Sequence, residues 1–85
     1  GDKLLKLVVD FGGEPAVQKQ IMSGIAEYFP DPSVLVGREM PFVTNLEPRK
    51  LRGYESEGMI MAVGTGEKIV LLHPSEEVPP GSIVK

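Results

Sequence analysis

The sequence of 85 residues contains no cysteine, no tryptophan and one histidine, His73. Without cysteine, the chain cannot form a disulfide framework, an iron–sulfur site, a thiol nucleophile or a cysteine-based zinc module. A single histidine leaves no His pair for a metal site. No apolar run approaches the ~20 residues that cross a bilayer, and no signal-peptide pattern opens the sequence. We therefore expect one compact cytoplasmic domain with no membrane partner.

The sequence also lacks a basic surplus, because nine Lys and Arg residues face twelve Asp and Glu residues, for a net charge of -3. This balance argues weakly against nucleic-acid binding, since proteins of that class usually carry an excess of positive charge. The distribution is uneven, however: Arg49, Lys50 and Arg52 stand within four residues. The positive charge is concentrated there, and such a local patch is sufficient to bind nucleic acid over a small contact area.

Apolar runs of strand length, separated by Gly and Pro, predict a small β protein. The predicted strands span residues 4–10, 18–25, 42–44, 58–63, 68–73 and 82–84. Between the second and third strands, Asp31, Pro32 and Gly37 suit the cap, the first turn and the end of a short helix. Short strands at this spacing with one helix in this place predict an all-β fold, an OB-type Greek-key barrel.

Motifs for catalysis are weak in this sequence. Ser23 and Ser56 have no histidine nearby along the chain, and Gly64-Thr65-Gly66 lacks the Lys-Ser/Thr ending of a phosphate loop. We interpret Gly64-Thr65-Gly66 as a hairpin turn. The acidic residues are scattered singly, so no carboxylate dyad is indicated. We therefore predict no catalytic residue, no metal site and no cofactor within this segment.

The polar connection over residues 44–57 joins two apolar strands and is long for a hairpin. Long connections in compact domains are often functional. Its three clustered cations are suited to backbone phosphates, and each such contact adds affinity that fades with salt. Asn45, at a strand end, offers a donor and an acceptor to a base edge or a 2′-hydroxyl. The alternative is a solvated turn whose cations only offset the glutamates of the same segment.

Two kinds of side chain near this connection are ambiguous. Met59 and Met61 lie two apart in one predicted strand, so they share a face, which is more typical of a core than of a stacking surface. Tyr54, within the charged connection, is a candidate to stack on a base. It is equally suited to anchor the connection by packing against it.

Five motifs occur in order along nearly the whole chain. They are Asp2-Lys3-Leu4, Met22-Ser23-Gly24-Ile25-Ala26, Asn45-Leu46-x-Pro48-Arg49-Lys50-Leu51-Arg52-Gly53, Ser56-Glu57-Gly58-Met59-Ile60 and Val78-Pro79-Pro80-Gly81-Ser82. Together they resemble the tRNA-binding domain at the C-terminus of many bacterial methionyl-tRNA synthetases. The same family includes free-standing bacterial tRNA-binding proteins and eukaryotic synthetase-associated cofactors.

The resemblance implies one tRNA-binding OB-fold domain over residues 1–85, with the barrel in 1–63 and a C-terminal β extension in 64–85 that supports homodimerisation. It implies binding of tRNA by shape and backbone, in support of aminoacylation by a methionine–tRNA ligase domain outside this chain. A tethered second site of this kind raises the effective concentration of tRNA. The residues that the resemblance implicates in tRNA binding are Lys3, Ser23, Asn45, Arg49, Lys50, Arg52, Ser56, Glu57 and Met59.

The family begins with a further strand before the Asp-Lys-Leu motif, whereas Gly1 directly precedes Asp2 here. We therefore expect the first barrel strand to be absent from this chain. Two alternative functions stay open. A homodimerisation module is favoured by the apolar strands at 58–63 and 69–72 and the Pro-Pro-Gly tail. A peptide-binding secretion chaperone of the same fold shares the stretch at residues 9–12, but it lacks the intact Asn-Leu-x-Pro-Arg-Lys run and therefore ranks behind tRNA binding.

Overall fold

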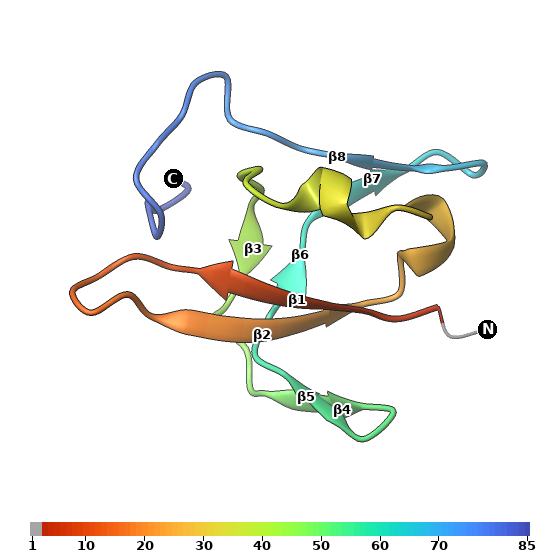
Figure 1. Cartoon of the computed structure of the whole chain (residues 1–85), viewed down its shortest axis with the longest axis horizontal. Coiled ribbons are helices and arrows are strands. Elements are labelled where there is room, and N and C mark those ends of the chain that lie inside the picture. Colours follow the sequence, from red (N-terminus) through yellow and green to blue (C-terminus); the bar gives the residue numbers. More distant parts are fainter. Residues whose placement is uncertain (1–2) are drawn as a thin grey trace.

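The computed structural model describes residues 3–85, and Figure 1 shows a small β structure with short helical turns. Its elements are β1 (Leu5–Asp10), β2 (Gln18–Ser23), η1 (Ala26–Tyr28), η2 (Pro32–Leu35), β3 (Phe42–Val43), β4 (Arg49–Leu51), β5 (Tyr54–Ser56), β6 (Met59–Ile60), β7 (Ala62–Gly64) and β8 (Ile69–Leu71). The predicted absence of a strand before the Asp-Lys-Leu motif, like Asp2 itself, falls outside the described residues and stays a prediction. No helix within residues 3–85 has the length and apolar character needed to span a membrane.

The strands pair in four antiparallel ladders, β1–β2, β3–β6, β4–β5 and β7–β8. Strand β2 joins three of them, because it pairs with β1 and also contacts β5 and β6. The backbone N–H of Glu57 donates to the Gln20 carbonyl at 2.8 Å, which ties the end of β5 to β2. The ladders therefore form one small all-β domain, and the predicted all-β class is confirmed.

The core is centred on β2 and the turns that follow it. Ile21, Met22, Ile25 and Leu35 are buried, and Ile21 is fully so. Strand β1 covers them with one face, since its residues alternate between half-buried and exposed along the strand. Burying one such aliphatic side chain contributes about 1.5–3 kcal/mol. A core with this few members depends strongly on each of them.

The helix predicted over residues 31–37 is shorter than expected and forms only the 3-10 turn η2. Asp31 caps it as predicted, since its carboxylate accepts from the hydroxyl of Ser33 at 2.6 Å and from the backbone N–H of Ser33 at 3.2 Å. These hydrogen bonds hold the pKa of the Asp31 carboxyl below its ordinary value. The β-branched Val34 and Val36 disfavour continuation as an α-helix. Gly37, at a φ of 82°, then reverses the chain.

Two predicted strands differ in the structure. The strand predicted over residues 58–63 breaks at Met61, so that β6 pairs with β3 while β7 pairs with β8. The terminal strand predicted over residues 82–84 does not form. Instead, both the N–H and the hydroxyl of Ser82 donate to the Pro79 carbonyl, at 3.1 and 2.6 Å. This local turn uses the backbone N–H of Ser82, so that group is not available to pair with a neighbouring strand.

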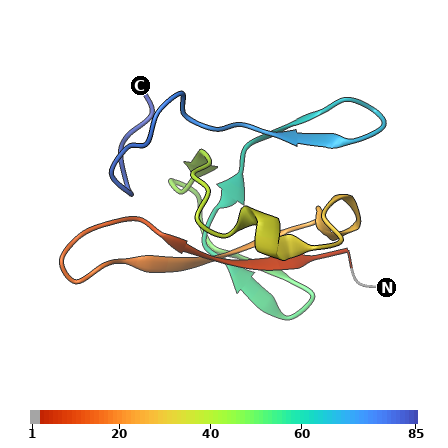
Figure 2. The same ribbon diagram turned by 45° about the horizontal axis from the view of Figure 1, so that its top comes forward.

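The segment after β8 returns to the barrel, as Figure 2 shows for the C-terminal end of the chain. Its first anchor is Glu39, whose backbone carbonyl accepts from Nδ1 of His73 at 2.7 Å and whose side chain accepts from the Val78 N–H at 2.8 Å. Its second anchor is a close approach of Gly81 to Gly12, where a Cβ on either glycine would collide with backbone of the other segment. The hairpin turn predicted at Gly64-Thr65-Gly66 is confirmed, because it connects the paired strands β7 and β8. The predicted boundary between barrel and extension stays a prediction.

Candidate nucleic-acid interface

The three clustered cations lie on the β4–β5 hairpin, which projects from the lower side of the domain in Figure 1. Its turn consists of two residues, Arg52 and Gly53, with φ values of 51° and 83°. Two-residue hairpin turns of type I′ require positive φ at both positions. The long connection predicted over residues 44–57 therefore contains a hairpin that the sequence did not predict. The hairpin was not predicted from the sequence, because Arg-Gly is not the usual turn pair and each strand is only three residues long.

The register of the hairpin divides its side chains between two faces. Arg49 lies opposite Ser56, Leu51 lies opposite Tyr54, and Lys50 lies opposite Glu55. Residues directly opposite one another in an antiparallel pair share a face. Arg49 and Leu51 therefore lie on one face with Tyr54 and Ser56, whereas Lys50 lies on the reverse face.

The cations of the hairpin are available to a ligand. Arg49, Lys50 and Arg52 are all exposed. None of the three forms an ion pair with any residue in the range 3–85. Cations without an intramolecular partner can contact phosphates without first breaking an ion pair. The alternative, that these cations merely offset neighbouring glutamates, has no direct pairing to support it within the described residues.

A pocket of about 210 Å³ lies where the β4–β5 hairpin meets the end of β2 and β6, and we call it the hairpin pocket. It is lined by Met22, Ser23, Gly24, Arg49, Leu51, Ser56, Gly58, Met59 and Ile60. Four of the residues predicted to bind tRNA thus come together here: Ser23, Arg49, Ser56 and Met59. The other five lining residues were not predicted to bind tRNA, although each lies within one of the five motifs: Met22, Gly24, Leu51, Gly58 and Ile60.

Ser56 and Glu57 hold the hairpin to β2. Ser56 is buried, and its hydroxyl accepts from the Met22 N–H at 2.9 Å and donates to the Gly58 carbonyl at 2.8 Å. The carboxylate of Glu57 accepts from the Gln20 N–H at 2.9 Å. Both side chains are therefore engaged in the fold and position the residues beside them. Their direct contact with tRNA stays a prediction.

Lys3 and Asn45 lie outside the hairpin pocket. Both are exposed, and the Lys3 backbone carbonyl accepts from the Ala26 N–H at 3.0 Å. Asn45 follows β3 and precedes the hairpin along the chain. Their roles in binding also stay predictions. Within residues 3–85, no group of three His, Cys, Asp or Glu side chains is placed to hold a metal ion.

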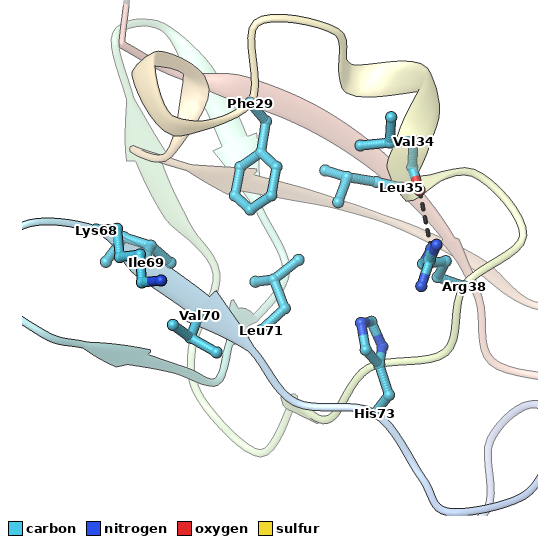
Figure 3. Close-up of a pocket in the computed structure, with 9 residues that line it drawn as sticks. All are labelled: Phe29, Val34, Leu35, Arg38, Lys68, Ile69, Val70, Leu71 and His73. Atoms are coloured by element: carbon cyan, nitrogen blue, oxygen red, sulfur yellow. Dashed lines mark hydrogen bonds between the residues drawn. The ribbon is translucent and has the colours of Figure 1, made fainter.

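A second pocket, of about 370 Å³, lies between the turns η1–η2 and strand β8, and we call it the η2–β8 pocket. Figure 3 shows Phe29, Leu35 and Leu71 pointing into it, with His73 and Arg38 at one end. The Arg38 guanidinium donates from Nε to the Val34 carbonyl at 3.1 Å. This pocket is mainly aliphatic and aromatic, and it contains none of the residues predicted to bind tRNA.

Known proteins share both the sequence pattern and the fold. The sequence matches the family described as "Putative tRNA binding domain" over residues 1–83. The crystal structure of a MetRS related protein from Pyrococcus horikoshii has a TM-score of 0.86 and 42% sequence identity, covering 100% of this chain and 75% of that chain. The chaperone CsaA from Bacillus anthracis str. Ames has a TM-score of 0.85 and 28% identity, covering 100% of this chain and 79% of that chain. Because the family match spans nearly every residue, the chain belongs to the tRNA-binding domain family.

Proposed function

We propose that the chain binds tRNA through the β4–β5 hairpin and the hairpin pocket, recognising shape and backbone with little sequence preference. The observation that carries this proposal is the set of three exposed cations on the hairpin, none of which is ion-paired within residues 3–85. Phosphate contacts supply affinity that does not depend on sequence. The hairpin holds these cations beside a pocket, so backbone contacts and a contact with one nucleotide can form together.

The proposed role of this binding is to support aminoacylation by methionyl-tRNA synthetase. The similarity to a MetRS related protein and the five ordered motifs favour this context. In that role the domain acts as a second tRNA site beside a catalytic domain, and it raises the local concentration of tRNA. We also propose that the domain forms homodimers through its C-terminal extension and that it acts in the cytoplasm.

The test is a titration of tRNA binding over salt concentration with the intact chain. Replacing Arg49, Lys50 and Arg52 together by alanine should reduce the dependence of log affinity on log salt by about two to three, because each lost phosphate contact removes about 0.7–0.9. The matched control replaces Lys6, Lys68 and Lys85 by alanine. It removes the same charge from β1, the β7–β8 turn and the C-terminus. Equal slopes for the two variants would contradict binding by the hairpin.

A second candidate function is binding of unfolded polypeptide, as the similarity to a chaperone permits. The observation that favours it is the η2–β8 pocket, with its apolar wall and the cations Arg38 and Lys68 at its margin. Such a site would take an apolar side chain flanked by acidic residues. Competition separates the two candidates. If Leu71→Glu abolishes polypeptide binding but leaves tRNA binding unchanged, the two ligands bind to different surfaces. If an unfolded acidic polypeptide also displaces tRNA from the wild-type chain, the two surfaces cannot be occupied at the same time.

A further inference from the structure

The hairpin pocket offers an apolar surface suited to one planar ring system. Its volume is about 210 Å³, and Met22, Leu51, Met59 and Ile60 supply its aliphatic and thioether lining. Met59 keeps 51% of its surface exposed, so its side chain is accessible to a ligand. Thioether groups pack favourably against aromatic rings. The pocket is thus an apolar recess beside exposed cations rather than a sealed part of the core.

Two polar side chains of this pocket have no partner within residues 3–85. The hydroxyl of Ser23, at the end of β2, makes no hydrogen bond there, and the guanidinium of Arg49 makes neither a hydrogen bond nor an ion pair. A hydroxyl can donate to or accept from any base edge, and a guanidinium plane can stack on a base or bind a phosphate. Ser56 differs, because both of its hydrogen-bonding functions are used within the fold.

The pocket also has an open mouth next to the cations. A Cβ placed on Gly24, at the edge of the pocket, would meet no atom within 4 Å. Arg49 lines the pocket and Arg52 follows in the turn of the same hairpin, whereas Lys50 lies on the reverse face; a phosphate bound by Arg49 therefore lies close to the pocket. Successive nucleotides of an RNA strand can then place one phosphate on the hairpin and one base in the recess.

We propose that the hairpin pocket binds one unstacked base of the bound RNA. This inference rests on the proposed tRNA binding and specifies which part of the RNA the pocket takes. Unpaired bases in loops and bulges present both a π-face and free edges to a protein. The pocket accepts the base by contact with its face, and Ser23 contacts its edge. Because a hydroxyl serves as donor or acceptor, the site accepts different bases with little preference.

The experiment compares three RNA hairpins that differ at one position. The first carries a single unpaired nucleotide in its stem, the second carries an abasic nucleotide there, and the third is fully paired. We expect the wild-type chain to bind the first about tenfold more tightly than the second, because the base contributes stacking that the abasic site lacks. The second and third should bind with similar affinity, since both offer only the backbone.

Variants locate that base contact in the protein. Ser23→Leu fills the recess and should remove the tenfold preference, so that this variant binds the unpaired-base hairpin and the abasic hairpin with similar affinity. Ser23→Ala keeps the recess open and should retain most of the preference. The matched control is Ser75→Leu, at an exposed position after β8 that does not line the pocket. It should behave as the wild type.

Three outcomes contradict this inference in distinguishable ways. If the wild-type chain binds the unpaired-base hairpin and the abasic hairpin with equal affinity, base binding by the pocket is contradicted. The proposed tRNA binding by the hairpin cations would still hold. A preference that survives Ser23→Leu would place the base elsewhere, for example on the exposed ring of Tyr54. Failure to bind any of these hairpins or tRNA would overturn the proposed function itself. The first comparison needs no variant, so it remains decisive even where Ser23→Leu does not fold.

Discussion

The β4–β5 hairpin and the β7–β8 hairpin have the same architecture but present opposite chemistry to the solvent. Each pairs two strands of three residues in an antiparallel ladder. The first exposes Arg49 and Lys50, whereas the second exposes Val63 and Val70, which lie directly opposite each other. Backbone pairing therefore does not distinguish the two surfaces. Their side chains do, since one suits a polyanion and the other an apolar partner.

Salt should separate the two surfaces most strongly. Raising the salt concentration from 50 to 200 mM should weaken tRNA binding roughly 20- to 40-fold if three phosphate contacts are made. Self-association through Val63 and Val70 should change little, because burial of apolar surface is not screened by ions. Fluorescence anisotropy with tRNA and sedimentation of the free chain measure the two effects. A parallel loss of both would show that the surfaces are not independent.

Charges placed on the β7–β8 hairpin should convert a dimer of this domain into a monomer. We expect Val63→Lys combined with Val70→Glu to keep the cross-strand pair favourable while adding polar groups to an apolar surface. Sedimentation at micromolar concentration measures the outcome, and tRNA affinity should stay within about twofold per protomer. The control combines Val8→Lys with Val17→Glu on the β1–β2 hairpin, where both valines are exposed. A wild-type chain that sediments as a monomer would contradict dimerisation.

Ser56 should link the stability of the domain to the position of the cationic hairpin. Ser56→Ala leaves the buried N–H of Met22 without its acceptor, which should lower the free energy of unfolding by about 1–3 kcal/mol. tRNA binding should weaken as well, because the hairpin loses an anchor to β2. Chemical denaturation measures the first effect. Ser75→Ala, at an exposed position, is the control and should change neither quantity.

The smallest expected effect belongs to the hairpin turn. Arg52→Asn removes one charge but keeps a residue that tolerates the observed φ of 51°. It should reduce the slope of log tRNA affinity against log salt concentration by about one and leave the melting temperature unchanged. Arg52→Val removes the same charge, but a β-branched residue is strained at positive φ. We therefore expect Arg52→Val to melt at a lower temperature than Arg52→Asn. Equal melting temperatures would contradict a role of the positive φ at residue 52 in stability.

Much of the fold was predictable because its signals are local. Gly and Pro marked the ends of most strands. Asp31 and Pro32 predicted the position of the turn η2 correctly, but the predicted helix was too long. The β4–β5 hairpin was missed because two adjacent positive φ values depend on pairing across the turn, and Arg52 carries no local signal for them. The terminal strand predicted over residues 82–84 does not form, and the N–H of Ser82 bonds within the turn to the Pro79 carbonyl instead.

The fold class, the cluster of three cations and the ordered motifs that resemble the tRNA-binding family could be read from the sequence. These depend on residue type and spacing along the chain. The folded structure was needed to show that the cations lie on a tight hairpin, that Ser23, Arg49 and Met59 share one pocket, and that Ser56 is buried. In the pocket, Ser23 meets Arg49 and Met59, and Ser56 bonds to Met22, each across more than twenty positions of the sequence. Packing and long-range hydrogen bonds, rather than local preference, bring them together.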